Sequence, residues 1–563
     1  MELKELIDVA AGRKPADLVL RNGKLVNVFS GEIIETDVVI HGDRIAAIGE
    51  GYEARTEIDL AGQYVMPGFI EGHIHIESSM LSPKRFAEAV VRHGTTTVIA
   101  DPHEIANVLG LEGIRFMLRD SENLPVDIFF MAPSCVPATN METSGAVLTA
   151  DDLRKLRDEP RILGLAEMMN FPGVVMGLPD VLEKLEVFDL RDGHAPLLRG
   201  KDLNGYIAAG IYSDHECVDI DEAREKLRRG MQIMVREGTG ARNLEALIGL
   251  LDESNWPFLS LVSDDRHPGT LLNEGHLNGI IAGAIQHGAP LINAVRMATI
   301  NTARYFRLYD RGGIAPGKIA DIVVTPKLPE ITHVLKNGRL VVKDGQLTAP
   351  GDVPVGRRLG EVRLEPDAGK LVVRPGKGKM RVIVAHEGSL LTDVMLVEPK
   401  VENGQVVSDT ERDVLKISVW ERHHGTGNVG VGFVHGFGLK RGAIAGSVAH
   451  DSHNVIAVGV SDSDILTAVE RIREMGGGLV VVADGKVLAE LPLPIAGLMT
   501  DMPIEETARL ESELNEAAHG LGSTMSAPFM TLSFMALPVI PHLKLTDKGL
   551  VDVDRFDFVG LFE

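Results

Sequence analysis

Two histidines separated by one residue, His73 and His75, are the first side chains in this sequence whose type and spacing could do chemistry. They lie among apolar residues in the segment 68–79. Because side chains alternate between the two faces of a strand, both imidazoles would point the same way. Neutral imidazole is a common metal ligand, so the pair could form part of a metal site. The alternative is two histidines in a half-buried strand, and the rest of the chain must decide between them.

Further residues of the ligand type follow later apolar runs, each near the point where a run stops. In a parallel barrel the catalytic groups gather at the C-terminal ends of the strands. Each residue alone has an ordinary explanation, since an acidic residue at a strand end often caps the next helix. Their recurrence in order favours one shared site, whose candidates after the first pair are Asp101, His103, Glu104, Glu167, His194, His215, Asp264 and Asp265.

The elements that must position these residues lie in the middle of the chain, residues 67–315. Repeated βα units predict a parallel sheet with both faces covered, and about 250 residues fits a (β/α)8 TIM-like barrel. We therefore predict a barrel catalytic domain over 67–315. Its strand-like runs are 95–100, 127–132, 162–167, 207–214 and 258–264, and its helical patterns include 151–158, 221–237 and 241–251.

Two similar β-rich flanks enclose this segment. Asn22-Gly23 lies between two apolar runs, a pattern that predicts a hairpin, and Asn337-Gly338 repeats it far downstream. The simplest interpretation is one small composite β-sandwich domain formed by residues 1–66 and 316–370, with the barrel inserted between its halves.

The pattern changes again at about residue 371, and we predict a separate C-terminal α/β domain over 371–563. Its strand-like runs are 382–385, 414–420 and 479–483, and its helical runs are 463–474 and 504–518. The glycines at 476–478 are not followed by Gly-Lys-Ser/Thr, so we discount nucleoside triphosphate binding. Several histidines of this domain could bind a metal, line the barrel mouth or form a buried polar network, and the sequence leaves these roles open for His423, His424, His435, His450 and His453.

Composition excludes several classes of partner. The formal net charge is −23, from 57 basic and 80 acidic residues, which disfavours binding to nucleic acid or to an anionic membrane. Cys135 and Cys217 are the only cysteines, so no disulfide framework is implied. The first residues contain no apolar signal core, and no long apolar run follows. We expect a cytoplasmic enzyme for a small molecule, assembled as a homodimer or larger homo-oligomer.

The order of these motifs resembles the amidohydrolase superfamily of metal-dependent hydrolases. The segments 67–75 and 314–321 carry this likeness, and the segments 72–79, 101–107, 264–268 and 537–541 are similar to those of bacterial and archaeal adenine deaminases. The resemblance covers nearly the whole chain. It implies hydrolysis of adenine to hypoxanthine and ammonia by a metal-activated hydroxide, in purine salvage.

The resemblance also implies a binuclear metal centre. His73, His75 and Asp264 would bind one metal, and His194 and His215 would bind the other. The family points to Mn(II) or Fe(II), and such a mixed imidazole and carboxylate site also suits Zn(II).

Many superfamily members bridge the two metals with a carboxylated lysine, whereas here Glu167 stands at the corresponding position. Asp264 would take a proton from water and pass it to the departing amine, as a general base that becomes an acid. Asp265 is the alternative for that role. His215 or His194 could polarise the ring.

Glu77 bears on the charge of the substrate, because it would lie on the same face as His75 if the strand continued. Dihydroorotases, which act on acidic substrates, carry arginine there, and arginine pairs with carboxylates. A carboxylate would repel an anion and accept N–H groups of a neutral ring such as adenine, although Glu77 could instead cap the next helix. His103, Glu104 and Asp265 are further candidates for substrate binding.

Two other functions stay open. One is a different cyclic amide or amidine hydrolase of the same superfamily. The other is a non-catalytic scaffold, which would be expected to have lost the metal ligands.

Overall fold

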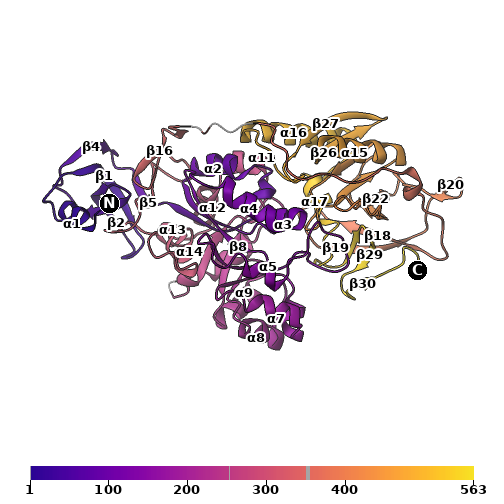
Figure 1. Cartoon of the computed structure of the whole chain (residues 1–563), viewed down its shortest axis with the longest axis horizontal. Coiled ribbons are helices and arrows are strands. Elements are labelled where there is room, and N and C mark those ends of the chain that lie inside the picture. Colours follow the sequence, from indigo (N-terminus) through magenta and orange to yellow (C-terminus); the bar gives the residue numbers. More distant parts are fainter. Residues whose placement is uncertain (1, 253, 350, 352–354) are drawn as a thin grey trace.

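The computed structural model describes residues 2–252, 254–349, 351 and 355–563. Figure 1 shows three bodies along the longest axis of the molecule. The N-terminal strands lie at one end, the barrel lies in the middle, and the C-terminal domain forms the other end.

Eight parallel strands in chain order form the barrel, in one five-stranded and one three-stranded ladder. The N–H of Asp264 donates to the carbonyl of His73 at 3.0 Å, which joins the segment after the last strand to the first. This arrangement confirms the predicted TIM-like fold. The strands are β6 (Phe69–Ile74), β7 (Thr95–Ala100), β8 (Asp127–Ala132), β9 (Ile162–Met168), β10 (Arg191–Gly193), β11 (Ser213–Asp214), β12 (Gln232–Arg236) and β13 (Leu259–Val262).

Alternation along the barrel strands separates an inner and an outer core. On β7, Ile99 packs inside with Ile70 of β6, whereas Val98 and Ala100 pack with the helices outside. Burial on both faces explains why these strands are continuous apolar runs. The main covering helices are α2 (Pro83–Val91), α3 (His103–Leu109), α4 (Leu111–Asp120), α5 (Ala150–Arg154), α7 (Pro179–Leu185), α8 (Gly200–Ala208), α9 (Ile220–Arg228) and α12 (Leu277–Gln286).

Two of the predicted barrel elements are wrong in part. The helix expected over 221–237 ends at Arg228, and its second half is strand β12. The run 207–214 begins inside helix α8 and becomes a strand only at Ser213. Gly230 and Gly210 adopt φ angles of 92° and 84°, and a left-handed glycine of this kind ends a helix.

The two flanks of the barrel contribute to one sheet. Its strand order is β17-β16-β15-β14-β5-β1-β2-β3, with β4 paired to β1, so residues from both ends of the barrel segment lie side by side. The domain boundaries stay a prediction. The strands are β1 (Ala16–Asn27), β2 (Glu32–His41), β3 (Arg44–Ile48), β4 (Ala54–Asp59), β5 (Tyr64–Pro67), β14 (Ile322–Thr325), β15 (His333–Lys336), β16 (Arg339–Lys343) and β17 (Gln346–Leu347), and α1 (Leu3–Ala10) packs against them.

The two Asn-Gly pairs have different outcomes. Asn337-Gly338 connects β15 and β16 as the predicted hairpin. Asn22-Gly23 lies inside β1, which pairs with β2 on both sides of a register shift. Asn22 has a φ of 56°, and a Cβ on Gly23 would lie 2.6 Å from Cγ2 of Val65. The first pair is therefore a bulge in a long strand, and the hairpin prediction was wrong there.

The C-terminal domain contains an eight-stranded sheet in the order β19-β18-β23-β22-β25-β24-β26-β27. Alternating residues of β24 and β26 cover both faces: Ala445 and Val480 pack with helix α15 (Asp462–Met475), and Ile444 and Val481 pack in the cluster that includes α16 (Ile504–Gly520). The sheet strands are β18 (Met380–Ala385), β19 (Thr392–Val397), β22 (Leu415–Trp420), β23 (Val429–His435), β24 (Ala443–Gly446), β25 (Val455–Gly459), β26 (Gly478–Ala483) and β27 (Lys486–Pro492). In the described part of the chain, no helix is long and apolar enough to cross a membrane.

Candidate active site

His73 and His75 lie at the C-terminal end of β6, with ring centroids 5.1 Å apart. The strand ends at Ile74, and His75 precedes a short 3-10 helix, Ile76–Ser79. Nδ1 of His75 lies 3.0 Å from the Asp101 carbonyl, so Nδ1–H donates there and leaves the Nε2 lone pair free. Nε2 of His73 is buried and has no hydrogen-bond partner. Both histidines therefore present a nitrogen suited to metal binding.

Glu167, near the end of β9, lies between two pairs of histidines. Its Oε1 is 3.3 Å from Nε2 of His75 and 3.8 Å from Nε2 of His73. Its Oε2 is 2.7 Å from Nδ1 of His194 and 3.3 Å from Nε2 of His215. Burial opposes ionisation of this carboxyl, but the neighbouring His194 and His215 hold its pKa well below the usual value. One ionised carboxylate thus faces four imidazoles, two on each oxygen.

Asp264 directs one oxygen to the same histidines. Its Oδ1 lies 3.2 Å from Nε2 of His75 and 3.7 Å from Nε2 of His73. Its backbone φ is 54°, a value that residues other than glycine seldom adopt and that often marks a functional position.

The geometry of these side chains fits a pair of divalent metals. Three of the groups with potential ligand atoms within 4.8 Å of one another are His73-His75-Asp264, His73-Glu167-His215 and His194-His215-Glu216. The unpartnered Nε2 of His73 needs a partner, and a metal would supply one. The structure brings together all six residues assigned as ligands in the sequence, while their role as ligands stays a prediction.

Arg236 and Glu216 belong to this site and were missed in the sequence. Nη1 of Arg236 donates to Oδ2 of Asp264 at 2.6 Å, and Nη2 donates to Oε2 of Glu216 at 3.0 Å. Arg236 ends strand β12, which lies within the segment predicted as helix. The apolar residues 233–235 were a signal for the strand, and Glu216 directly follows His215.

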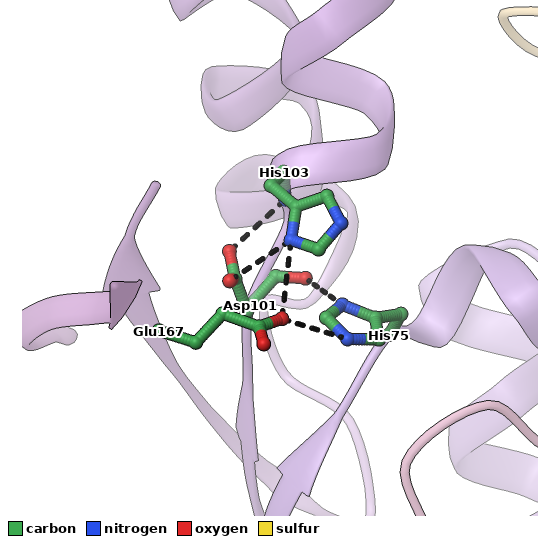
Figure 2. Close-up of side chains that lie close together, drawn as sticks. All are labelled: His75, Asp101, His103 and Glu167. Carbon is green, nitrogen blue, oxygen red and sulfur yellow. Dashed lines mark hydrogen bonds and ion pairs between the residues drawn. The ribbon is translucent and has the colours of Figure 1, made fainter. Parts of the chain in front are cut away.

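His103 begins helix α3 and lies beside His75 and Glu167. Its Nδ1 is 3.0 Å from Oδ2 of Asp101 and 3.5 Å from Oε1 of Glu167. Figure 2 shows His75 and His103 converging on Glu167, with the Asp101 carboxylate beside the His103 ring. His103 therefore extends the polar cluster toward the mouth of the barrel.

Glu104 links the barrel to the C-terminal domain. Its Oε1 lies 2.7 Å from Nδ1 of His450, and its Oε2 is hydrogen-bonded to Nε2 of His453. Because Nδ1 of His453 accepts the N–H of Ala449 at 3.2 Å, Nε2 must carry the proton that is donated to Glu104. His450 and His453 thus lie at the barrel mouth.

The other three histidines whose roles the sequence left open, His423, His424 and His435, lie apart from this contact. Nε2 of His423 is 2.7 Å from the Ser452 carbonyl, and Nε2 of His424 is 2.9 Å from the Ser144 carbonyl. His435 contacts the carbonyls of Arg412 and Asp413.

Two of the predicted substrate-binding residues have different surroundings. Glu77 lies in the short helix rather than on an extended strand, so its expected place on the His75 face was wrong. Its Oε1 accepts the N–H of Ile105 at 3.1 Å, and burial, aided by Glu104, raises the pKa of Glu77 to about 7. Asp265 accepts a hydrogen bond from the Ser78 hydroxyl. Their roles in substrate binding stay predictions.

A cavity of about 30 Å³ lies over the histidine and carboxylate cluster. One wall comes from the barrel, and the other is largely apolar and comes from the C-terminal domain, through Leu390, His450, Asp451, Phe534, Leu537 and Ile540. A larger hollow of about 1010 Å³ lies near residues 84–88 and 336–349, and no histidine or cysteine lines it.

Comparison with known proteins matches the chain to two family models. The Amidohydrolase family covers residues 64–348, and the Adenine deaminase C-terminal domain covers residues 389–557. A protein named adenine deaminase from Desulfatibacillum aliphaticivorans is 50% identical over 99% of both chains. One of the same name from Brucella anthropi is 49% identical over 99% of this chain and 100% of its own. Among solved structures, a β-aspartyl dipeptidase from Fervidobacterium islandicum AW-1 is 17% identical with a TM-score of 0.46, over 60% of this chain and 100% of its own.

Proposed function

The chain belongs to the adenine deaminase family of the amidohydrolases, and from this premise we propose that it hydrolyses adenine to hypoxanthine and ammonia. The observation that supports the proposal best is the Glu167 carboxylate, which has one oxygen near His73 and His75 and the other near His194 and His215. A neutral heterocycle also suits a cavity with an apolar wall.

The proposed metal ligands are His73, His75 and Asp264 for one ion and His194 and His215 for the other, with Glu167 shared by both. Bound Mn(II) or Fe(II), with Zn(II) as the alternative, would lower the pKa of water and so supply a nucleophile at neutral pH. The buried surroundings strengthen every electrostatic interaction at the reacting carbon.

Asp264 is the proposed proton carrier. Its Oδ2 is held by Arg236, so Oδ1 is the oxygen that faces the site and can take a proton from water. It would then give the proton to the amine that leaves C6 of adenine. Asp265, next in the chain, is the alternative carrier, and His215 or His194 would polarise the ring.

The decisive experiment measures ammonia release from adenine by protein loaded with Mn(II) or Fe(II). A panel of adenine, adenosine, cytosine and cyclic amides separates the proposed activity from other hydrolases of the family. We expect adenine to be the preferred substrate and about two metal ions per chain. Exclusive activity toward a cyclic amide would overturn the proposal, and less than one bound metal per chain would favour the non-catalytic scaffold.

Glu77→Gln tests whether this carboxylate contributes to substrate binding. We expect a higher KM or a lower kcat for adenine with unchanged bound metal, because the variant loses a carboxyl group near the site that could accept an N–H of the substrate. Glu186→Gln, at an exposed position, is the control. Kinetics equal to the unmodified enzyme would exclude this role for Glu77.

The location and assembly expected from the sequence are also part of the proposal. We propose a cytoplasmic enzyme, in keeping with two free buried cysteines, that forms a homodimer or a larger homo-oligomer. Light scattering of the purified chain measures the assembly directly.

A further inference from the structure

Asp451 of the C-terminal domain is a carboxylate that the reaction scheme above does not use. It lines the cavity over the histidine and carboxylate cluster and is only 2% exposed. Its Oδ2 is buried and has no hydrogen-bond partner in the described chain. A buried carboxylate oxygen without a donor is costly, so its retention in the cavity points to a ligand that brings one.

The loop that carries Asp451 is fixed to the barrel on both sides of this residue. His450 and His453 both bind the Glu104 carboxylate. The His450 ring also stacks on Phe534, with centroids 4.3 Å apart and an interplanar angle of 11°. Asp451 is therefore held in a defined position relative to the cluster.

The basic groups near Asp451 do not neutralise it. Its Oδ1 lies 3.9 Å from Nε2 of His103 and 3.8 Å from Nδ1 of His450, both beyond hydrogen-bond distance. Nδ1 of His450 is already occupied by Glu104. Burial raises the pKa of Asp451 to about 6, which leaves the carboxyl mostly ionised at neutral pH and so an acceptor.

We propose that Asp451 accepts an N–H of the five-membered ring of the purine and thereby selects the free base over bases substituted at N9. The inference rests on the proposed function. For C6 to face the metal cluster, the five-membered ring must extend away from it. Nδ1 of His103 lies 3.5 Å from Oε1 of Glu167, and Nε2 of His103 lies 3.9 Å from Oδ1 of Asp451. Asp451 thus lines the same cavity as the cluster and is separated from Glu167 by the His103 side chain. The five-membered ring of the purine would lie on this side of the cavity.

The apolar wall supports the same placement of the substrate. Leu390, Phe534 and Leu537 offer no hydrogen-bonding side chain and suit the flat face of a heterocycle. A substituent at N9 removes the N–H donor and leaves the Asp451 carboxylate buried without a partner. A site that hydrogen-bonds a substrate N–H rejects analogues without that N–H, because its own buried acceptor is then left unpaired.

The test compares adenine with 9-methyladenine in Asp451→Asn, which keeps the side-chain volume, and in Asp451→Ala. We expect kcat/KM for adenine to fall about 10- to 100-fold, the effect of one charge-assisted hydrogen bond. The value for 9-methyladenine should not fall, so the preference for adenine should shrink by the same factor. Asp554→Asn, at a half-exposed site of the same domain, should leave both substrates unaffected.

Direct binding of unsubstituted purine and of 9-methylpurine, measured by calorimetry, gives a readout that does not depend on catalysis. Asp451→Asn should weaken purine binding and leave 9-methylpurine unchanged. Equal losses for both ligands, unchanged purine affinity or loss of bound metal would each overturn the inference. If the unmodified protein released no ammonia from adenine, the proposed function would fail, and the binding comparison would still decide the role of Asp451.

Discussion

Arg236 is the residue that orients the carboxylates of the site. It lies between Asp264 and Glu216, and its guanidinium hydrogen-bonds to both. Neighbouring carboxylates raise the pKa of Arg236 against the effect of burial, so it stays charged. Because Oδ2 of Asp264 is taken by this bond, Oδ1 alone is free to face His73 and His75.

Replacing Arg236 with methionine should therefore destabilise the protein and reduce activity. The change leaves two buried carboxylates without their cation, and breaking a buried pair in this way costs about 3–5 kcal/mol. Thermal unfolding and ammonia release measure the two effects. Arg242→Met removes the exposed pair with Glu274 and should cost less than about 1 kcal/mol. Equal shifts in the two variants would contradict the assignment.

The sequence could predict the site residues that directly follow an apolar, strand-like run. His73, Glu167 and Asp264 each follow an apolar run, and the order of the runs is enough to bring them together at one end of a barrel. Arg236 also follows an apolar run, residues 233–235, but that run was assigned to a helix. Asp451 carries no such signal, and it reaches the site only because the C-terminal domain packs over the barrel.

At the scale of elements, helix α15 has conventional signals at both ends. The Ser461 hydroxyl accepts the N–H of Asp464 at the start. At the other end Gly476 adopts a φ of 79°, and Gly477 and Gly478, the first residue of β26, also have positive φ values. The three glycines therefore connect a helix to a strand.

Gly476→Ala should lower the free energy of unfolding by about 1 kcal/mol, because a Cβ strains the left-handed conformation. A Cβ there would have no close neighbour, since the nearest atom, Nη1 of Arg358, lies 3.7 Å away. Gly520→Ala is the matched control: Gly520 lies at the end of α16 and would also meet nothing within 4 Å. Urea unfolding should show a loss for the first variant alone, and equal effects would exclude backbone strain at Gly476.

The same local sequence can produce different elements, which limits prediction at this scale. Both Asn-Gly pairs separate two apolar runs, yet only Asn337-Gly338 forms the hairpin. At Asn22-Gly23 the outcome depends on β2, which pairs with β1 on both sides of the bulge. The pairing with β2 is a tertiary contact, and it cannot be read from the two apolar runs around Asn22-Gly23.

At the scale of the whole molecule, the candidate active site lies between the barrel and the C-terminal domain. The sequence left open whether C-terminal histidines line the barrel mouth, and it did not predict the contact that encloses the cavity. Lys544 stabilises the far wall of this cavity, because its Nζ donates to the carbonyls of Leu390 at 2.9 Å and Phe534 at 3.0 Å. Lys544 is fully buried, and burial lowers its pKa to about 7.

This buried lysine should make stability depend on pH. Between pH 7 and about pH 10, the unfolded lysine holds a proton that the folded one lacks, so the folded state gains stability as the pH rises. The slope is about 1.4 kcal/mol per pH unit for one proton. Lys544→Met removes this pH-dependent contribution. The substitution also leaves two carbonyls without a donor, but that loss of stability is the same at every pH.

The free energy of unfolding of Lys544→Met relative to the unmodified protein should therefore fall by about 1.4 kcal/mol per pH unit between pH 7.5 and 9.5. Urea unfolding at three pH values measures it. Lys548→Met is the control, because Lys548 is exposed and near the same strand, and it should show no such slope. A difference independent of pH would mean that Lys544 keeps its proton in the folded protein, and that the wall of the cavity is held by a charged rather than a neutral amine.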